Sequence, residues 1–177
     1  IGFSSSLYPG GDRTATASDN YQDVGVDGSY QYMGDGSNVY QLNARYTHER
    51  QSLGASHGLG AASNLRNTLD EFTTDASYYW KNQIGVTVGY FNTAGSADSL
   101  LYAGNRTSKP NSAGFTFQLD GTPFGETPSS LGNHMNLRLG VQYRLFTHFD
   151  GAAANYDGAG SNSSGNDTVT VFTWVAL

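Results

Sequence analysis

The sequence predicts an all-β fold, an antiparallel up-and-down arrangement of about eight strands, and two observations predict it. Apolar and polar residues alternate with a period of two along most of the chain, which is typical of strands with one apolar and one polar face. Long and short connectors also alternate, as expected for a meander with loops at one end and turns at the other. A Greek-key sandwich does not predict that order of connectors.

Seven segments alternate clearly, and the first stretch, residues 1–8, alternates only weakly. The apolar faces are formed in turn by Val24, Val26, Tyr30 and Tyr32; by Tyr40, Leu42, Ala44 and Tyr46; by Phe72, Thr74, Ala76, Tyr78 and Trp80; by Ile84, Val86, Val88 and Tyr90; by Phe115, Phe117 and Leu119; by Leu137, Leu139, Val141, Tyr143 and Leu145; and by Val169, Val171, Val175 and Leu177. The long polar connectors are 9–20, 52–67, 93–113 and 147–167, the tight turns are 34–37 and Lys81-Asn82, and 120–134 is intermediate. We expect a single domain spanning 1–177.

Composition excludes several classes of protein. The chain has no Cys, which excludes a disulfide scaffold, a thiolate metal site and covalent haem attachment. A net charge of −6 with scattered Arg argues against nucleic-acid binding, which needs a basic stripe. No apolar run approaches the length of a transmembrane helix. The chain starts at Ile1 with no signal segment, so we expect a processed protein or a piece of a longer one.

Alternation alone does not say which solvent meets the apolar face. A soluble barrel or sandwich turns apolar residues inward, whereas a membrane barrel turns them toward lipid and lines its lumen with polar groups. Four observations favour the membrane barrel: small residues and few Lys or Glu on the polar faces, aromatic residues near strand ends, strands of about 9–12 residues, and long loops opposite shorter turns. Unpaired backbone groups are costly in hydrocarbon, so the sheet must close or be completed by further strands.

This register assigns residues to the two faces. Charged residues expected to line the lumen are Asp23, Asp27, Arg45, Glu49, Glu71, Asp75, Arg138 and Arg144. Residues expected to face lipid are Val24, Val26, Leu42, Ile84, Val86, Val88, Leu137, Leu139 and Val141, and the interfacial aromatic residues are Tyr32, Tyr40, Tyr78, Trp80, Tyr90 and Tyr143. In a filled eight-stranded barrel the charges form buried ion networks, and in a wider barrel they line a wet pore; both alternatives stay open.

The end of the chain carries a family resemblance. The segment Thr168-Val-Thr-Val-Phe-Thr-Trp-Val-Ala-Leu177 resembles the assembly signal of Gram-negative outer-membrane β-barrels, with Val169, Val171, Val175 and Leu177 as its apolar positions and Leu in place of the usual final Phe. Residues 114–177 are similar to poorly characterised porin-like proteins, some associated with c-type cytochromes. The resemblance implies a bacterial outer-membrane location, the barrel-assembly machinery as a partner and, since family members are longer, a larger barrel.

We therefore expect a non-enzymatic, porin-like barrel that gives passive passage or sheathes a partner across the outer membrane. A multihaem cytochrome is one such partner, although the chain has no Cys-x-x-Cys-His motif to bind haem itself. We expect no cofactor and no metal site, because the four His residues lack ligand spacing and the Asp- and Asn-rich loops match no EF-hand. The alternatives are a plugged adhesive barrel with partner-binding loops, a secreted β-sandwich that binds sugar and, more remotely, a lipid-A-modifying enzyme.

Overall fold

The protein forms one antiparallel sheet of eight strands in the described part of its computed structural model, which covers residues 2–9, 18–34, 36–124 and 136–176. Each strand pairs with the next along the chain, in the order β1 to β8. The strands are β1 (Gly2–Pro9), β2 (Ser18–Met33), β3 (Val39–Leu53), β4 (Arg66–Trp80), β5 (Ile84–Gly95), β6 (Ser112–Gly121), β7 (Asn136–His148) and β8 (Thr168–Ala176). The predicted all-β antiparallel meander is confirmed.

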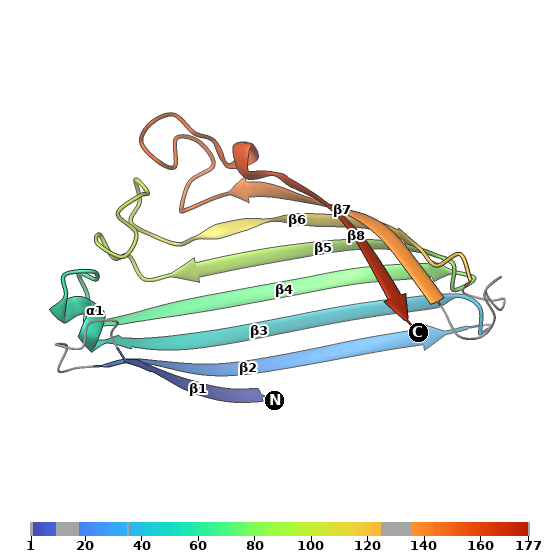
Figure 1. Ribbon diagram of the computed structural model, residues 1–177, viewed down its shortest axis with the longest axis horizontal. Helices are drawn as coiled ribbons and strands as arrows, with labels where there is room; N and C mark the ends of the chain where they lie inside the picture. Colours follow the sequence, from blue (N-terminus) through green and yellow to red (C-terminus); the bar gives the residue numbers. More distant parts are fainter. Residues whose placement is uncertain (1, 10–17, 35, 125–135, 177) are drawn as a thin grey trace.

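The two ends of the sheet differ in their connectors. A short helix, α1 (Gly54–Gly58), and the long connectors 96–111 and 149–167 lie at one end, and the short β2–β3 and β4–β5 turns lie at the other (Figure 1). At the β4–β5 turn, Lys81 and Asn82 both have positive φ values, 50° and 53°. These values are close to the left-handed conformation of type I′ hairpin turns, which match the twist of antiparallel strands.

The sheet is strongly curved but is not closed. Its strand order runs from β1 to β8, and β1 and β8 do not pair with each other in the described residues. Of the two expected alternatives, closure of the sheet by its own first and last strands is therefore not found in the described residues. In the view of Figure 1, β7 and β8 curl across the front of the sheet, so this view looks onto its concave face.

Three of the strands, β2 to β4, are clearly longer than the sequence predicts, whereas β5, β6 and β8 have the expected length. We expected about 9–12 residues, but β2 has 16 residues and β3 and β4 have 15 each. The extra residues lie at the loop end, where β3 and β4 extend into the expected loop 52–67. There both faces are polar, with Arg50 opposite Thr68 on one face and Gln51 opposite Asn67 on the other, so hydrophobic alternation carries no signal. Residues 10–17 of the expected loop 9–20 lie outside the described residues.

Strands β6 and β7 contain an irregularity in their pairing. Their register shifts between Ala113 and Gly114. A Cβ atom added to Gly114 would lie 1.9 Å from the carbonyl oxygen of Leu145, so the close approach of the two backbones requires glycine there. The irregularity lies near the loop end of the two strands, where Ala113 pairs with His148 and Gly114 with Phe146, so β7 holds one extra residue there.

Very little apolar side-chain surface is buried. Among described residues the buried apolar side chains are Val39, Leu53, Ala55 and Ala62, most of them at the loop end. In contrast, Val86 and Val88 on β5 are 47% and 46% exposed. No helix in the described residues is both long and apolar enough to span a membrane.

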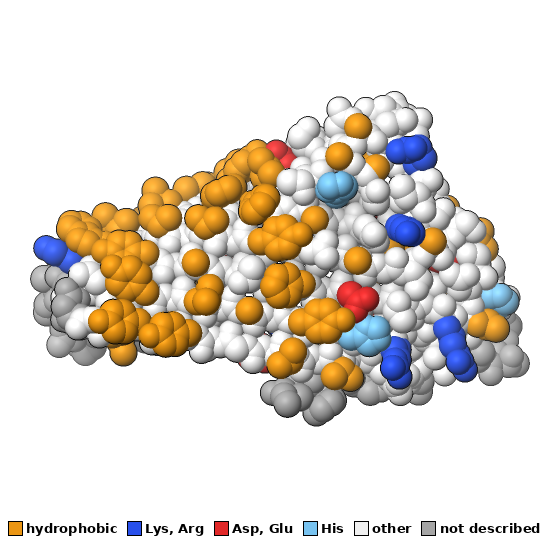
Figure 2. Space-filling model, turned by 180° about the vertical axis from the view of Figure 1, so that it is seen from behind, with side chains coloured by type: hydrophobic (Ala, Val, Ile, Leu, Met, Phe, Trp, Pro, Cys, Tyr) orange, Lys and Arg blue, Asp and Glu red, His pale blue; other side chains and the backbone are white. Residues whose placement is uncertain are grey.

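Exposed hydrophobic side chains gather on one face, seen from behind in Figure 2. They cover the half of this face next to the turns, whereas the His and acidic side chains and most of the Lys and Arg side chains lie toward the long loops (Figure 2). We call the apolar half the outer band. It includes Val24, Val26, Leu42, Ile84, Val86, Val88, Leu119, Leu139, Val141 and Val171, all at least 40% exposed.

Candidate functional site

All eight charged residues that we expected in the lumen lie on the face opposite the outer band. The register pairs Asp23 with Glu49 and Asp27 with Arg45 across β2 and β3. Glu71 and Asp75 on β4 lie opposite Thr47 and Asn43, which share the face of Arg45. On β7, Arg144 lies opposite Thr116 of the same concave face, and Arg138 forms an ion pair with Asp120 there. Their role in lining a lumen stays a prediction.

The polar face is hollowed along its middle. A groove of about 350 Å³ crosses β3 to β7, and most of its lining is amide, hydroxyl or small. The side chains and glycine that line it include Gln41, Asn43, Thr73, Asp75, Ser77, Thr87, Gly89, Thr116, Gln118, Gln142 and Arg144. This concave face can therefore hold water and polar solutes, which find many hydrogen-bonding groups there.

Amide side chains, rather than pairs of opposite charges, connect most of the concave face. Gln41 donates to Asn43 over 3.1 Å, and Asn43 donates to Asp75 over 2.9 Å. On the other side of the groove, Gln142 donates to Gln118 over 3.0 Å, and Gln118 donates to Asp120 over 2.9 Å. The ion pair that Arg138 forms on this face is with Asp120, which is not one of the eight predicted charges.

An ion pair on this face involves a residue that we did not predict from the sequence to lie there. Arg138 Nε lies 2.8 Å from Asp120 Oδ2, and the Arg138 guanidinium stands 5.9 Å from the Phe172 ring centre. Arg144 similarly stands 4.8 Å from the ring centre of Phe91. Asp120 was assigned to the connector 120–134, although it continues the alternation of Thr116 and Gln118 by one more step.

Two rows of aromatic rings cross the outer face. Near the turns, Tyr40 lies 6.2 Å from Tyr32 and 4.8 Å from Tyr78, measured between ring centres. Trp80 continues this row and has the Lys81 ammonium 5.1 Å from its ring. At the other border of the outer band, Tyr90 lies 6.4 Å from Phe72 and 5.5 Å from Phe115. Along β4 the rows are six residues apart, about 20 Å at the rise of a strand.

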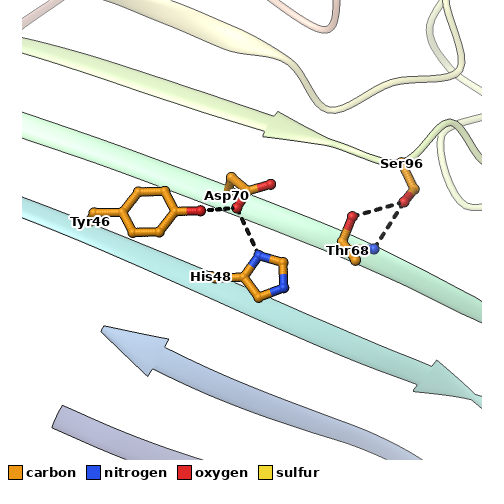
Figure 3. Close-up of polar contacts among 5 residues, drawn as sticks. All are labelled: Tyr46, His48, Thr68, Asp70 and Ser96. Carbon is orange, nitrogen blue, oxygen red and sulfur yellow. Dashed lines mark hydrogen bonds and ion pairs between the residues drawn. The ribbon is translucent and has the colours of Figure 1, made fainter. Parts of the chain in front are cut away.

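Two further tyrosines of the outer face, Tyr46 opposite Phe72 and Tyr143 opposite Phe117, direct their hydroxyl groups to carboxylates. Tyr143 donates to Asp167 over 2.6 Å, and Tyr46 donates to Asp70 over 2.5 Å. His48 Nδ1 lies 2.8 Å from the same oxygen of Asp70, because the register places the two residues opposite each other (Figure 3). The apolar parts of the tyrosine rings thus lie at the band and their polar tips beyond it.

The end of the chain follows the same division of faces. Val169, Val171 and Val175 are on the outer face of β8, and Val171 is 80% exposed. Phe172 and Trp174 lie on the concave face, opposite Gly140 and Arg138 in register. Leu177, the last residue of the expected assembly signal, lies outside the described residues.

One buried carboxylate organises the loops that follow β3 and β5. Asp98 is 1% exposed and accepts hydrogen bonds from the backbone of Ser63, Asn64 and Leu101, at 2.8 to 3.0 Å. The side chains of Ser63 and Asn67 donate to it as well. Burial alone raises the pKa of Asp98, but these hydrogen bonds outweigh burial and hold the pKa well below its usual range.

The loops after β5 and β7 also contact each other. The backbone N–H of Arg106 donates to the carbonyl of Tyr156 over 2.7 Å, and Arg106 Nε donates to the carbonyl of Asn155. Within the second loop, hydrogen bonds from Ser161 and from the Ala159 N–H lower the pKa of Asp157 to about 2. No three His, Asp or Glu residues in the described ranges come together as a metal site.

No protein-family model, no curated protein and no solved structure matches this chain. The case for a function therefore depends on the geometry of the two faces and of the loop end.

Proposed function

We propose that this chain forms part of the wall of a transmembrane β-barrel in a bacterial outer membrane. The barrel gives polar solutes passive passage along the concave face. The observation that carries the proposal is the segregation of the faces: an exposed apolar band on the convex side and a polar groove on the concave side.

The cost of exposing the outer band to water supports a lipid environment. Val24, Val26, Val86 and Val171 are each about half exposed or more, and they belong to one continuous band. Soluble monomers seldom expose contiguous apolar patches of more than a few hundred Å². In a bilayer the same side chains meet acyl chains, and aromatic rows at both borders of the band occupy the positions of interfacial girdles.

The edge strands β1 and β8 show that a membrane form of this sheet needs additional strands. Each has one edge of backbone N–H and C=O groups without a partner strand in the described sheet. Such groups cost several kcal/mol each in hydrocarbon. We therefore propose that further strands pair with β1 and β8 and complete a ring wider than eight strands.

Because the chain contains no Cys, single introduced cysteines give a direct test. Val86 and Thr87 are neighbours on β5, but Val86 lies in the outer band and Thr87 lines the groove. In membranes, Thr87→Cys is expected to react rapidly with a charged, water-soluble maleimide, and Val86→Cys at least tenfold more slowly.

In detergent-free denaturant both cysteines should react at the same rate, which controls for intrinsic reactivity. Equal labelling of the two variants in membranes would contradict the proposal, as would recovery of the protein in the soluble fraction. Channel activity of the purified protein in planar bilayers then separates an open lumen from a plugged one.

A second candidate function is a binding barrel whose loops hold an external partner. The hydrogen bonds between the long connectors favour it. Asp98 joins the connector after β5 to the one after β3, and Arg106 joins it to the one after β7. A sheath around a multihaem cytochrome is a version of this candidate, with the partner on the concave face instead. Copurification of a haem-staining protein that survives washing at high salt would support the sheath over the open pore.

A further inference from the structure

The outer face changes abruptly from apolar to basic where the outer band ends on β2, β3 and β4. Val24 and Val26 on β2 lie opposite His48 and Tyr46 on β3. The next outward position on β3 is Arg50, which lies opposite Thr68 on β4. Arg66 lies two residues before Thr68 and on the same face of β4. The two arginines therefore occupy diagonal positions across β3 and β4. Diagonal positions are close enough for two long side chains to reach one ligand.

A groove runs along this border. It has a volume of about 540 Å³ and is lined by Gln22, Val24, Val26, Tyr46, His48 and Arg50, together with the backbone at Gly25. Its floor is formed by the two valines and the tyrosine ring. Its end nearest the long loops is formed by Gln22, His48 and Arg50. The groove therefore presents an apolar trough that ends at hydrogen-bond donors and a positive charge.

The charges at this end are not neutralised within the described residues. Neither Arg50 nor Arg66 forms an ion pair with a described residue. The one carboxylate beside them, Asp70, accepts hydrogen bonds from the Tyr46 hydroxyl and from His48. Figure 3 shows both side chains directed at Asp70. This end of the groove therefore has two positive guanidinium groups beside one carboxylate that is already hydrogen-bonded, although the net charge of the chain is −6.

We infer that this groove binds a phosphorylated, acylated glycolipid of the outer leaflet. An acyl chain lies along Val24, Val26 and Tyr46, and a headgroup phosphate is held by Arg50 and Arg66. The inference rests on the proposed outer-membrane barrel, in which long loops face the exterior and the loop end of the band is the outer-leaflet border. Guanidinium groups suit this role because their planar donors match phosphate oxygens in pairs.

The test measures binding of diphosphoryl lipid A to the protein purified from membranes in detergent, by native mass spectrometry. We expect Arg50→Ala with Arg66→Ala to weaken binding at least tenfold. Arg45→Ala is the matched control, because Arg45 is on the same strand but lies on the concave face, and it should change binding less than twofold. Enzymatically dephosphorylated lipid A should bind the unaltered protein as weakly as diphosphoryl lipid A binds the double variant.

A second lipid distinguishes the headgroup. Phosphatidylglycerol, which carries one phosphate and no sugar, should bind more weakly than diphosphoryl lipid A and respond less to the double substitution. Equal binding of the two lipids, equal loss in Arg45→Ala, or no loss in the double variant would overturn the inference.

Failure of this inference is separable from failure of the proposed function. If the protein shows heat-modifiable migration and the cysteine pattern of a barrel yet fails the lipid test, only the glycolipid site is wrong. If it does not insert into membranes, both proposals are wrong.

Discussion

Arg138 of β7 and Asp120 of β6 form an ion pair on the concave face, with Nε 2.8 Å from Oδ2. The two partners differ in exposure: the Asp120 side chain is 2% exposed and the Arg138 side chain 35%. Gln118 also donates to Asp120, so the carboxylate joins an amide chain to the cation. The pair binds β6 to β7 close to the turn end of the groove.

The first prediction concerns the strength of this pair. We expect Asp120→Ala to destabilise the protein, because it removes the acceptor for both Arg138 and Gln118. A double-mutant cycle with Arg138→Ala should give a coupling of about 1 kcal/mol, since one partner is well solvated. Urea unfolding in detergent micelles measures the unaltered protein, the two single variants and the double variant. Strictly additive effects would show that the pair contributes nothing to stability.

The second prediction concerns a close contact between β7 and β8. A Cβ atom added at Gly140 would lie 2.2 Å from Cζ of Phe172, which lies opposite it in register. Gly140→Ala should therefore displace the Phe172 ring from the Arg138 guanidinium and destabilise the protein by about 1–3 kcal/mol. Phe172→Ala in the same chain should restore most of the loss. A variant Gly28→Ala, with nothing within 4 Å of the added Cβ, is the matched control.

The third prediction concerns the buried carboxylate of the loop end. Asp98→Asn keeps the shape of the side chain but replaces one accepting oxygen with an amide NH2 group, which donates and cannot accept. Several N–H and O–H donors of Ser63, Asn64 and Leu101 then lose part of their acceptor, at a cost of about 1–3 kcal/mol for each buried group left unpaired. Hydrogen exchange should show faster exchange at 63, 64 and 101, while amides in the middle of β4 and β5 stay protected.

The fourth prediction concerns the pH dependence of the same loops. The pKa of Asp98 is lowered in the folded protein, so its contribution to stability is complete above the unfolded pKa of about 3.9. This contribution is lost as pH falls from there through the folded value. Protection factors at 63, 64 and 101 should therefore stay constant down to about pH 5 and decrease progressively as the pH falls below about 4. The decrease should be much smaller in Asp98→Asn, and an unchanged decrease there would assign it to another group.

The fifth prediction concerns ion selectivity in the proposed pore. On the described concave face of β2 to β7, the acidic groups Asp23, Asp27, Glu49, Glu71, Asp75 and Asp120 outnumber Arg45, Arg138 and Arg144. The pore should therefore prefer cations. Asp27→Asn with Asp75→Asn should shift the reversal potential in a salt gradient toward zero. Asp70→Asn, on the opposite face of β4, should leave it unchanged.

The sequence by itself determined the strands and the two faces. Alternation placed Val86 with Tyr78 and Leu119 on one face and Asp75 with Arg144 on the other, because successive side chains of a strand point to opposite sides. The antiparallel order followed from the alternation of long and short connectors. The expected aromatic positions Tyr32, Tyr40 and Tyr78 likewise share one row.

Only the tertiary structure decided which residues meet across strands and within loops. The pairing of His48 with Asp70 depends on the position of the connection between β3 and β4. That connection contains α1 and polar residues, and hydrophobic periodicity in the sequence does not locate it. Asp98 draws donors from residues more than 30 positions away, which no local pattern encodes. The open sheet between β1 and β8 is also a tertiary result, because closure depends on curvature and strand number summed over the whole sheet rather than on any single strand.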